Sequence, residues 1–562
     1  MEETIRKSFE EWKEKASADP DLRQELDSME ENAVNEAFYT QLSFGTAGLR
    51  GIIGAGTNRM NVYTVARASR AMAKFARSKN ACPSAAIAYD SRIKSELFAR
   101  TAAAVFAEEG VKVHLFDELE PTPCLSFAVR YFSCDVGVMV TASHNPAAYN
   151  GYKAYGSDGC QMTEEHAGEV YRIMQTIPVL QAFPEKTFEA SLQDGSIEWI
   201  GEEVMEAYLE NVRRQSVVPE NAAIDRNVSI VYTPLNGAGR KPVLEILRRS
   251  GFTNVTVVKE QEEPDGRFPT CPYPNPEIYE AMDLGIRTCK EANADLLIAT
   301  DPDSDRLSVA VRKPDGEYRI LSGNEFGSIL LSFLIEKRKE SGTLPDRPVA
   351  VKSIVTTELA EAIAESENVE MRNVLTGFKY IGEQIGLLEK AHEEERFVFG
   401  FEESCGFLSG SYVRDKDAVV ASMLAAEMFA SLKSEGKSLL DRLSELEDRF
   451  GHFKNAVHQL SYPGIEGKKT MARIMESLRN AVDSFGSRQV VSMIDYLEGK
   501  ELPPSDVLEF RLTDGDKIIV RPSGTEPKIK VYVTAVGKTG EEAEAKAQTL
   551  FELAKERLAD ES

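Results

Sequence analysis

The apolar positions of the chain alternate between short continuous runs and longer runs with helical spacing. The acidic first 40 residues place Ile5, Phe9 and Trp12 at helical spacing, which predicts a helix. The predicted strands are 85–90, 111–116, 136–140, 228–232, 255–258, 295–299, 349–354 and 397–400, and the predicted helices are 95–109, 241–249, 325–339 and one that begins at Glu277. Strands that alternate with helices in this way predict an α/β fold of parallel or mixed sheets with helices on both faces.

The same alternation of predicted strands and helices begins three times along the chain before the pattern of apolar positions changes. From about residue 451 the chain combines a predicted helix at 470–485, polar strands at 517–520 and 529–534, and a closing helix at 541–558. This tail predicts a smaller α+β domain. The predicted division is a helical extension over 1–40, three α/β domains over 41–215, 216–323 and 324–450, and a fourth domain over 451–562.

Charge and cysteine content exclude several classes of protein. The 562 residues carry a formal charge of −25, which disfavours nucleic acid and anionic membranes because both need a basic footprint. No apolar run approaches the ~18 residues of a membrane helix. The acidic start lacks the regions of a signal peptide, so we expect a cytoplasmic protein. The seven cysteines contain no C-x-x-C pair, which argues against a disulfide framework or a zinc site.

The first motif with chemical potential is TASHNP, residues 141–146, directly after the apolar run 136–140. Small polar residues at the end of a buried strand lie at the carboxyl edge of a sheet, where α/β folds bind ligands. Ser143 beside His144 could be a nucleophile. The alternative is an ordinary serine in a turn, which the hexapeptide taken alone favours. A serine-esterase elbow, G-x-S-x-G, is absent.

The second motif is DPDSDR, residues 301–306, after another apolar strand. Asp301, Asp303 and Asp305 repel one another unless a cation binds between them. Ligation by oxygen alone suits Mg²⁺. An EF-hand is excluded because Arg306 and Arg312 occupy its glycine and glutamate positions. A solvated acidic turn is the remaining alternative, which the apolar residues on both sides disfavour.

Two further loops carry groups suited to a sugar phosphate. In GFEESCG, residues 400–406, Glu402 and Ser404 lie two apart and point the same way on an extended loop, as vicinal sugar hydroxyls require. In RPSGTEPK, residues 521–528, a turn between strands offers hydroxyls and backbone N–H groups as a phosphate cradle, and Arg521 adds a bidentate charge. Each loop alone could equally be an ordinary polar turn.

Together the four motifs supply a nucleophile, a metal site, sugar contacts and a phosphate clamp, one from each predicted domain. With these four motifs, the sequence resembles the α-D-phosphohexomutase superfamily, which contains phosphoglucomutases and phosphomannomutases. The resemblance runs from about residue 40 to the end and includes FGTAGLRG (44–51), PDGRFP (264–269), PNPE (274–277) and TGFK (376–379). It implies four domains around a central cleft, the first three with a shared mixed-sheet α/β topology.

The resemblance also implies roles for individual residues. Ser143 is similar to the phosphoserine of the family, and Asp301, Asp303 and Asp305 resemble its ligands for one Mg²⁺, to which the Ser143 phosphate adds another ligand. The resemblance further implies sugar contacts at Glu402 and Ser404, a phosphate loop at Arg521, Ser523, Gly524 and Thr525, and assistance from Arg50, His144, Lys153, Arg306 and Lys379, with His144 and Lys379 as acid–base candidates.

The implied reaction is the interconversion of α-D-glucose 1-phosphate and glucose 6-phosphate through glucose 1,6-bisphosphate. The Glu-Glu-Ser sequence of the sugar loop resembles glucose-preferring mutases, and the acidic N-terminal extension resembles the bacterial α-phosphoglucomutase branch. The alternatives are a phosphopentomutase or phosphomannomutase, a metal-dependent phosphatase, and a phosphorylatable binding protein without catalysis. We expect a monomer or weak homo-oligomer.

Overall fold

The computed structural model describes residues 2–45, 48–462, 464–480, 482–500, 502–523 and 528–560. The chain divides into two compact units. Unit 1 comprises Met1–Ile320, Gly382–Glu395 and Gly406–Ser431, and unit 2 comprises Leu321–Ile381, Arg396–Cys405 and Leu432–Ser562. Within the described ranges, no helix combines the length and the apolar character that crossing a bilayer requires.

The N-terminal extension consists of three short helices and not the single helix that the apolar spacing predicted. They are α1 (Glu3–Lys15), α2 (Pro20–Ser28) and α3 (Glu31–Phe38). The break has a local cause: Pro20 starts α2, and the carboxylate of Asp19 accepts from the backbone N–H of Asp21 as its N-cap. Trp12 packs edge-on against Phe38 and Tyr63, which joins the extension to the core of unit 1.

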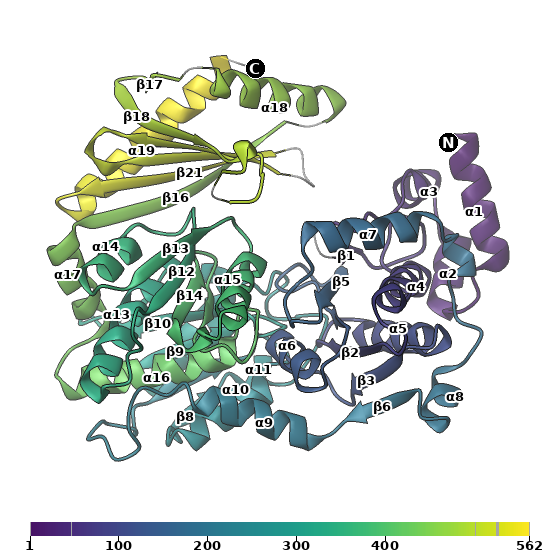
Figure 1. Cartoon of the computed structure of the whole chain (residues 1–562), viewed down its shortest axis with the longest axis horizontal. Helices are drawn as coiled ribbons and strands as arrows, with labels where there is room; N and C mark the ends of the chain where they lie inside the picture. Colours follow the sequence, from purple (N-terminus) through teal and green to yellow (C-terminus); the bar gives the residue numbers. More distant parts are fainter. Residues whose placement is uncertain are drawn as a thin grey trace. The chain divides into compact units, whose positions relative to one another are not determined.

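The first sheet of unit 1 has the strand order β1-β5-β4-β2-β3-β6. Its strands are β1 (Gly48–Ile52), β2 (Ser84–Tyr89), β3 (Lys112–Phe116), β4 (Val136–Val140), β5 (Tyr149–Gly156) and β6 (Ile197–Ile200). The helices are α4 (Val62–Lys79), α5 (Ser95–Glu108), α6 (Thr122–Tyr131), α7 (Glu164–Gln175), α8 (Phe188–Gln193) and α9 (Glu202–Arg213). Helices α4, α5 and α7 cover one face and α6 the other, so the predicted strand 136–140 is buried on both sides (Figure 1).

The second sheet of unit 1 has the order β11-β10-β9-β7-β8. It contains β7 (Ile230–Thr233), β8 (Val255–Val257), β9 (Leu296–Thr300), β10 (Leu307–Arg312) and β11 (Tyr318–Ile320), with helices α10 (Arg240–Arg249), α11 (Lys259–Glu262) and α12 (Tyr279–Ala292). Strands β9 and β10 form an antiparallel pair in which Leu307 lies opposite Thr300. The DPDSDR loop is therefore the tight connection between two buried strands.

Unit 2 begins with parallel strands in the order β13-β12-β14, namely β12 (Val349–Ser353), β13 (Glu370–Val374) and β14 (Phe397–Glu402). Helices α13 (Gly323–Ser341), α14 (Leu359–Ser366) and α17 (Leu439–Phe450) belong to the same unit. Gly327 of α13 lies directly against the ring of Phe401 on β14, which fixes how closely helix and sheet approach. The remaining elements are α15 (Phe378–Lys390), α16 (Ala418–Ser434), β15 (Gly406–Leu408) and the 3₁₀ turns Val179–Gln181, Glu394–Arg396, Tyr496–Glu498 and Thr513–Gly515.

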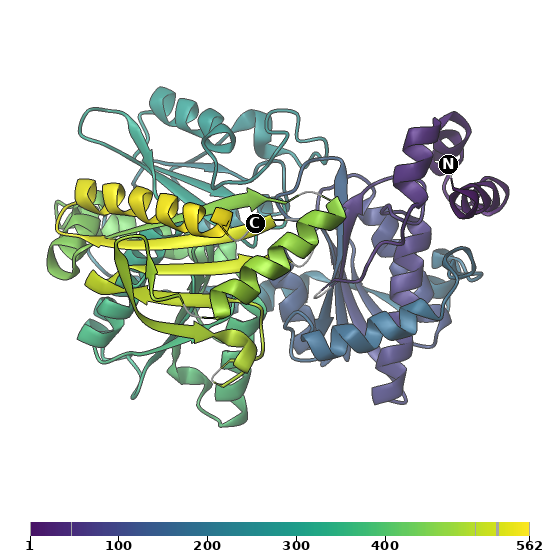
Figure 2. The same cartoon turned by 90° about the horizontal axis from the view of Figure 1, so that it is seen from above.

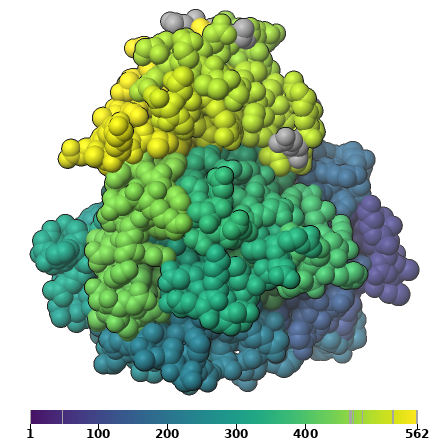
Figure 3. Space-filling view, turned by 60° about the vertical axis from the view of Figure 1, so that its left-hand side comes forward, coloured from purple at the N-terminus to yellow at the C-terminus, as the bar shows by residue number. Residues whose placement is uncertain are grey.

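An antiparallel sheet closes unit 2, in the order β16-β21-β20-β19-β18-β17. Its elements are β16 (His452–Ser461), β17 (Ser484–Phe485), β18 (Arg488–Asp495), β19 (Leu508–Leu512), β20 (Lys517–Pro522), β21 (Lys528–Gly537), α18 (Gly464–Arg479) and α19 (Gly540–Asp560). Helices α18 and α19 cover one face (Figure 2). The other face carries Ile519 and Tyr532, which pack with Ile354 and Leu375 of the parallel layer. Figure 3 shows the yellow-green C-terminal segment in contact with the teal and green segment that forms this layer.

The predicted α/β class with a final α+β domain is confirmed by these sheets. The helix predicted at 470–485 is displaced, because the chain is helical over Gly464–Arg479 and Ser484–Phe485 is a strand. Strand prediction was most accurate where both faces of the sheet are covered, as at β4, because such strands are continuously apolar.

Candidate active site

Ser143 lies in the loop that follows β4. Its side chain is buried, and its φ of 51° falls in the left-handed region that residues other than glycine rarely adopt. The backbone N–H of Ser143 donates to Thr141 Oγ1 at 2.8 Å. The loop therefore fixes the position of the Ser143 hydroxyl at a cost in backbone energy, an arrangement that is common at functional sites.

Two residues that the sequence analysis missed hold this loop in place. The guanidinium of Arg92 donates to the carbonyls of Ser143 at 2.5 Å and Tyr149 at 2.9 Å. Asp90 accepts from Thr141 Oγ1 at 2.6 Å and from the backbone N–H of Arg92 at 3.0 Å. A signal was present, because both residues follow β2, which pairs in parallel with β4, so that their loops share one edge of the sheet.

The predicted metal loop places its three carboxylates together. Asp301, Asp303 and Asp305 are each at most 1% exposed, and one oxygen from each lies within 4.8 Å of the others. The backbone N–H groups of Asp305 and Arg306 donate to Asp301 Oδ1 at 3.1 and 3.0 Å. The tight β9–β10 connection thus turns the carboxylates inward instead of leaving them as a solvated acidic turn.

The structure brings the candidate nucleophile to this trio. Ser143 Oγ donates to Asp301 Oδ2 at 2.7 Å, and it lies 3.1 Å from His144 Nδ1. Burial, with Arg306 and Arg50 nearby, lowers the pKa of His144 well below its ordinary value. The lowered pKa favours the neutral form of the His144 ring, whose Nδ1 lies within hydrogen-bond distance of the Ser143 hydroxyl.

Two ammonium groups offset part of the negative charge. Lys153 Nζ lies 2.7 Å from Asp303 Oδ2 and 3.1 Å from Asp305 Oδ2. Lys416, which the sequence analysis also missed, lies 3.2 Å from Asp305 Oδ2. Thr122 Oγ1 donates to Asp303 Oδ2 at 2.7 Å. Lys416 belongs to the charged run RDKD before an apolar helix, but nothing in that run indicates where it points.

The electrostatics of the trio fit a bound cation. Burial and the charges of Asp303 and Asp305 raise the pKa of Asp301 well above its ordinary value. At Asp303 and Asp305 burial is outweighed, chiefly by Lys153, and the pKa values are lowered. Among the described residues, Asp303 Oδ1 and Asp305 Oδ1 are buried without a hydrogen-bond partner. Buried carboxylate oxygens of this kind need a ligand, and oxygen-only donors suit a hard divalent ion.

The two arginines predicted for the site lie close to it. Arg50, on β1, donates to Asn145 Oδ1 of the TASHNP loop at 3.4 Å. Arg306 follows the metal loop and donates to Glu277 Oε1 at 2.5 Å. Unit 1 therefore collects the predicted residues Ser143, His144, Asp301, Asp303, Asp305, Lys153, Arg50 and Arg306 around one point.

Unit 2 carries the predicted sugar contacts. Glu402 ends β14, is 5% exposed, and accepts from the backbone N–H of Gly377 at 2.7 Å. Gly377 precedes α15, and Lys379 is in the first turn of that helix, with its Nζ 4.9 Å from the centre of the Tyr380 ring. Ser404 is half-buried two residues beyond Glu402. The TGFK and FEES motifs therefore meet through the hydrogen bond between Gly377 and Glu402.

The phosphate-loop candidates belong to the same unit. Arg521 lies on β20, and the backbone N–H of Ser523 donates to the Lys528 carbonyl at 2.8 Å, which closes the hairpin. Gly524 and Thr525 lie outside the described residues. Burial raises the pKa of Tyr532 to about 12; Glu403 adds to the rise and Arg521 opposes it. Tyr532 thus lies within electrostatic reach of both loops.

Comparisons with known proteins agree with this arrangement. Four sequence models described as phosphoglucomutase/phosphomannomutase, alpha/beta/alpha domains I, II and III and C-terminal domain, match residues 41–179, 206–316, 322–450 and 468–552. A phosphoglucomutase of Staphylococcus epidermidis is 37% identical over 515 residues, covering 89% of this chain and 91% of its own. One of Staphylococcus haemolyticus is 34% identical over 522 residues, covering 90% and 93%. A crystal structure of a putative phosphomannomutase from Thermus thermophilus is similar in fold, with a TM-score of 0.68, 23% identity and coverage of 91% and 99%.

Proposed function

The chain belongs to the phosphoglucomutase/phosphomannomutase family, and on that premise we propose that it is a phosphoglucomutase. It interconverts α-D-glucose 1-phosphate and glucose 6-phosphate through a phosphorylated Ser143 and a glucose 1,6-bisphosphate intermediate. The observation that supports this most directly is the 2.7 Å hydrogen bond from Ser143 Oγ to Asp301 Oδ2. It joins the candidate nucleophile to a carboxylate trio that can hold a cation.

We assign the cation as Mg²⁺, held by Asp301, Asp303 and Asp305, with an oxygen of the Ser143 phosphate as a further ligand. The all-carboxylate donor set, and the two buried oxygens that accept no hydrogen bond from a described residue, support this choice. Bound there, Mg²⁺ would neutralise charge on the oxygens of a phosphoryl group in transfer.

The protein groups around Ser143 have distinct tasks in the proposed reaction. The bond between Ser143 Oγ and phosphorus breaks as a sugar hydroxyl forms a new bond to phosphorus, and the hydroxyl proton passes to a base, for which His144 and Lys379 are the candidates. Lys153, Arg50 and Arg306 supply positive charge. The second phosphate of the bisphosphate then returns to Ser143.

Unit 2 is proposed to recognise the sugar phosphate. The Glu402 carboxylate accepts hydrogen bonds from sugar hydroxyls and the Ser404 hydroxyl exchanges one with them, while the segment from Arg521 to Thr525 binds the phosphate that is not in transfer. The position of Glu402 at a strand end, fixed by the Gly377 N–H, supports its role as a rigid contact.

We further propose a cytoplasmic enzyme that acts on sugar phosphates as a monomer or weak homo-oligomer, without nucleic acid or membrane as a partner. The charge of −25 supports the last two points. The proposed domains remain 1–40, 41–215, 216–323, 324–450 and 451–562, and the spacing of the four matched segments supports this division.

The decisive experiment incubates the pure protein with glucose 1-phosphate, Mg²⁺ and a trace of glucose 1,6-bisphosphate and follows the products by ³¹P NMR. Glucose 6-phosphate is expected. Release of inorganic phosphate would instead identify a phosphatase, and no turnover would identify a binding protein.

Sugar preference needs a second measurement, because a few loop contacts decide it by only ~1–3 kcal/mol. We expect kcat/KM to be highest for glucose phosphates when glucose, mannose and ribose phosphates are compared. A higher value for ribose 1-phosphate would assign the chain to phosphopentomutases.

A further inference from the structure

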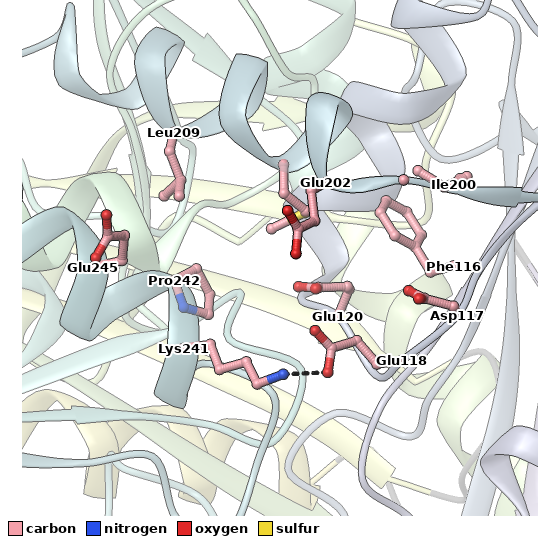
Figure 4. Close-up of a pocket in the computed structure, with 12 residues that line it drawn as sticks. Phe116, Asp117, Glu118, Glu120, Ile200, Glu202, Leu209, Lys241, Pro242 and Glu245 are labelled. Carbon is pink, nitrogen blue, oxygen red and sulfur yellow. Dashed lines mark hydrogen bonds and ion pairs between the residues drawn. The ribbon is translucent and has the colours of Figure 1, made fainter.

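A separate pocket in unit 1 has a volume of about 230 Å³. It lies where the loop after β3, the end of β6 and the helices α9 and α10 meet (Figure 4). Pockets for drug-sized ligands measure ~300–1,000 Å³, so this one suits a smaller molecule. None of the residues assigned to the active site above lines it.

The chemical character of the pocket is unusual. Its lining contains five carboxylates and one ammonium group, Lys241, which is paired with Glu118. Glu245 is paired with Arg248 and Arg249. Of the five carboxylates in the lining, Asp117, Glu120 and Glu202 form no ion pair with a described residue.

Glu120 distinguishes this pocket from an ordinary acidic surface. It is 4% exposed, and its Oε2 is buried without a hydrogen-bond partner in the described part of the chain. Figure 4 shows the carboxyl groups of Glu118, Glu120 and Glu202 turned toward one another. Burial, with Glu118 next, raises the pKa of Glu120 well above its ordinary value. A buried carboxyl group without a partner costs free energy that a cationic ligand would recover.

The walls of the pocket are apolar. Phe116, Met205 and Leu209 line it beside the carboxylates, so a ligand there contacts hydrocarbon on one side and negative charge on the other. The N-terminus of α9 also borders the pocket, but its partial charge of about +0.5 is outweighed by the unpaired carboxylates. An anionic ligand is therefore disfavoured.

A bare divalent ion fits less well than an organic cation. Among the described residues, the group of three carboxylates close enough to share one metal ion is Asp301, Asp303 and Asp305, and the pocket has no such group.

We propose that this pocket binds a small organic cation, a protonated primary amine on a short alkyl chain, with Glu120 as the central acceptor. The ammonium group lies at Glu120 and Glu202, and the chain lies along Met205 and Leu209.

The test measures binding by isothermal titration calorimetry, with 1,4-diaminobutane as the probe and 1,4-butanediol as an uncharged molecule of the same length. Binding is a better readout than activity, because Glu120 lies two residues before Thr122, the first residue of α6, which donates to Asp303. We expect the diamine to bind at millimolar concentration or below, also with Mg²⁺ present, and the diol not to bind.

Three variants locate the site. Glu120→Gln keeps the side-chain volume and is expected to weaken diamine binding by about tenfold or more. Met205→Trp, which fills the pocket without a change of charge, is expected to abolish binding. Glu203→Gln, an exposed change on the same helix, is the matched control and keeps wild-type affinity. Thermal unfolding without ligand establishes that each variant is folded. Absence of diamine binding to the wild type, or equal affinity in folded Glu120→Gln, would overturn the proposal.

Discussion

Ser143 Oγ donates a hydrogen bond of 2.7 Å to Asp301 Oδ2, although 158 positions separate the two residues in the sequence. The contact joins the edges of two different sheets, since Ser143 follows β4 and Asp301 follows β9. The phosphoryl group that we propose on Ser143 would therefore lie beside the three carboxylates, and a cation held between them would offset the repulsion among these anionic groups.

The first prediction concerns the nucleophile. Replacement of Ser143 by alanine removes the oxygen that we propose carries the phosphoryl group, so kcat/KM for glucose 1-phosphate should fall by at least about 1,000-fold. Incorporation of phosphate, measured by intact mass after incubation with glucose 1,6-bisphosphate, should also disappear. Ser341→Ala, at the exposed end of α13, is the control and should retain both properties. Full turnover by Ser143→Ala would remove Ser143 from the mechanism.

The second prediction concerns the metal. Mg²⁺ that binds the folded protein alone should raise its melting temperature, with a stabilisation of about 2.7 kcal/mol at 100 times the dissociation constant. Asp303→Asn removes one of the three charges and should largely abolish this Mg²⁺-dependent rise, measured by differential scanning fluorimetry. Asp315→Asn changes an exposed carboxylate in the next turn of the same sheet and should leave the rise intact. An undiminished rise in Asp303→Asn would place the ion elsewhere.

Much of this site could be predicted from the sequence because its parts are local. The trio at 301, 303 and 305 follows a strand that is buried along its whole length, and the tight turn after this strand brings the three carboxylates together. The family could be recognised for the same reason, because its motifs are short and local. The matched family models confirm it.

What could not be predicted depends on tertiary structure. Lys416 reaches Asp305 from 111 positions away in the chain, and no periodicity encodes such a contact. Arg92 acts through backbone carbonyls, which every residue possesses, so its partners carry no sequence signal. The break at Pro20 is different, because Asp19 followed by Pro20 is a helix-start signal that can be seen in the sequence. The helical spacing of the apolar residues before it led to the prediction of a single helix.

The third prediction compares two helical glycines. A Cβ atom at Gly327 would lie 2.2 Å from Phe401 Cδ2, so Gly327→Ala should force α13 away from β14 and lower the free energy of unfolding by ~1–3 kcal/mol. At Gly386, within α15, no described atom beyond the neighbouring helix backbone lies within 4 Å of the Cβ position, so Gly386→Ala should raise stability by ~0.5–1 kcal/mol through helix propensity. Thermal unfolding measures both, and shifts of the same sign would contradict the packing argument.

The fourth prediction concerns pH and Glu427, which lies on α16 far from the proposed metal ligands in sequence and is 2% exposed. Its carboxylate accepts from Ser216 Oγ and from the backbone N–H of Val217 at 3.2 Å, and Arg226 contributes a favourable charge. Burial outweighs these contacts and raises the pKa of Glu427 from 4.5 to about 7. Between these pH values the folded protein holds a proton that the unfolded chain has lost, so the stability contributed by Glu427 is complete below pH 4.5 and is lost as the pH rises to about 7.

Glu427→Gln cannot ionise and should remove this dependence. The pKa shift of Glu427 corresponds to roughly 3 kcal/mol. The free energy of unfolding of Glu427→Gln relative to wild type should therefore rise by roughly that amount between pH 4.5 and pH 8. Urea unfolding at several pH values measures the difference, and Glu203→Gln, which changes an exposed carboxylate, is the control. If the stability of Glu427→Gln relative to wild type stays flat or declines as the pH rises, Glu427 is ionised throughout this pH range. Its hydrogen bonds from Ser216 and Val217 would then outweigh the effect of burial on its pKa.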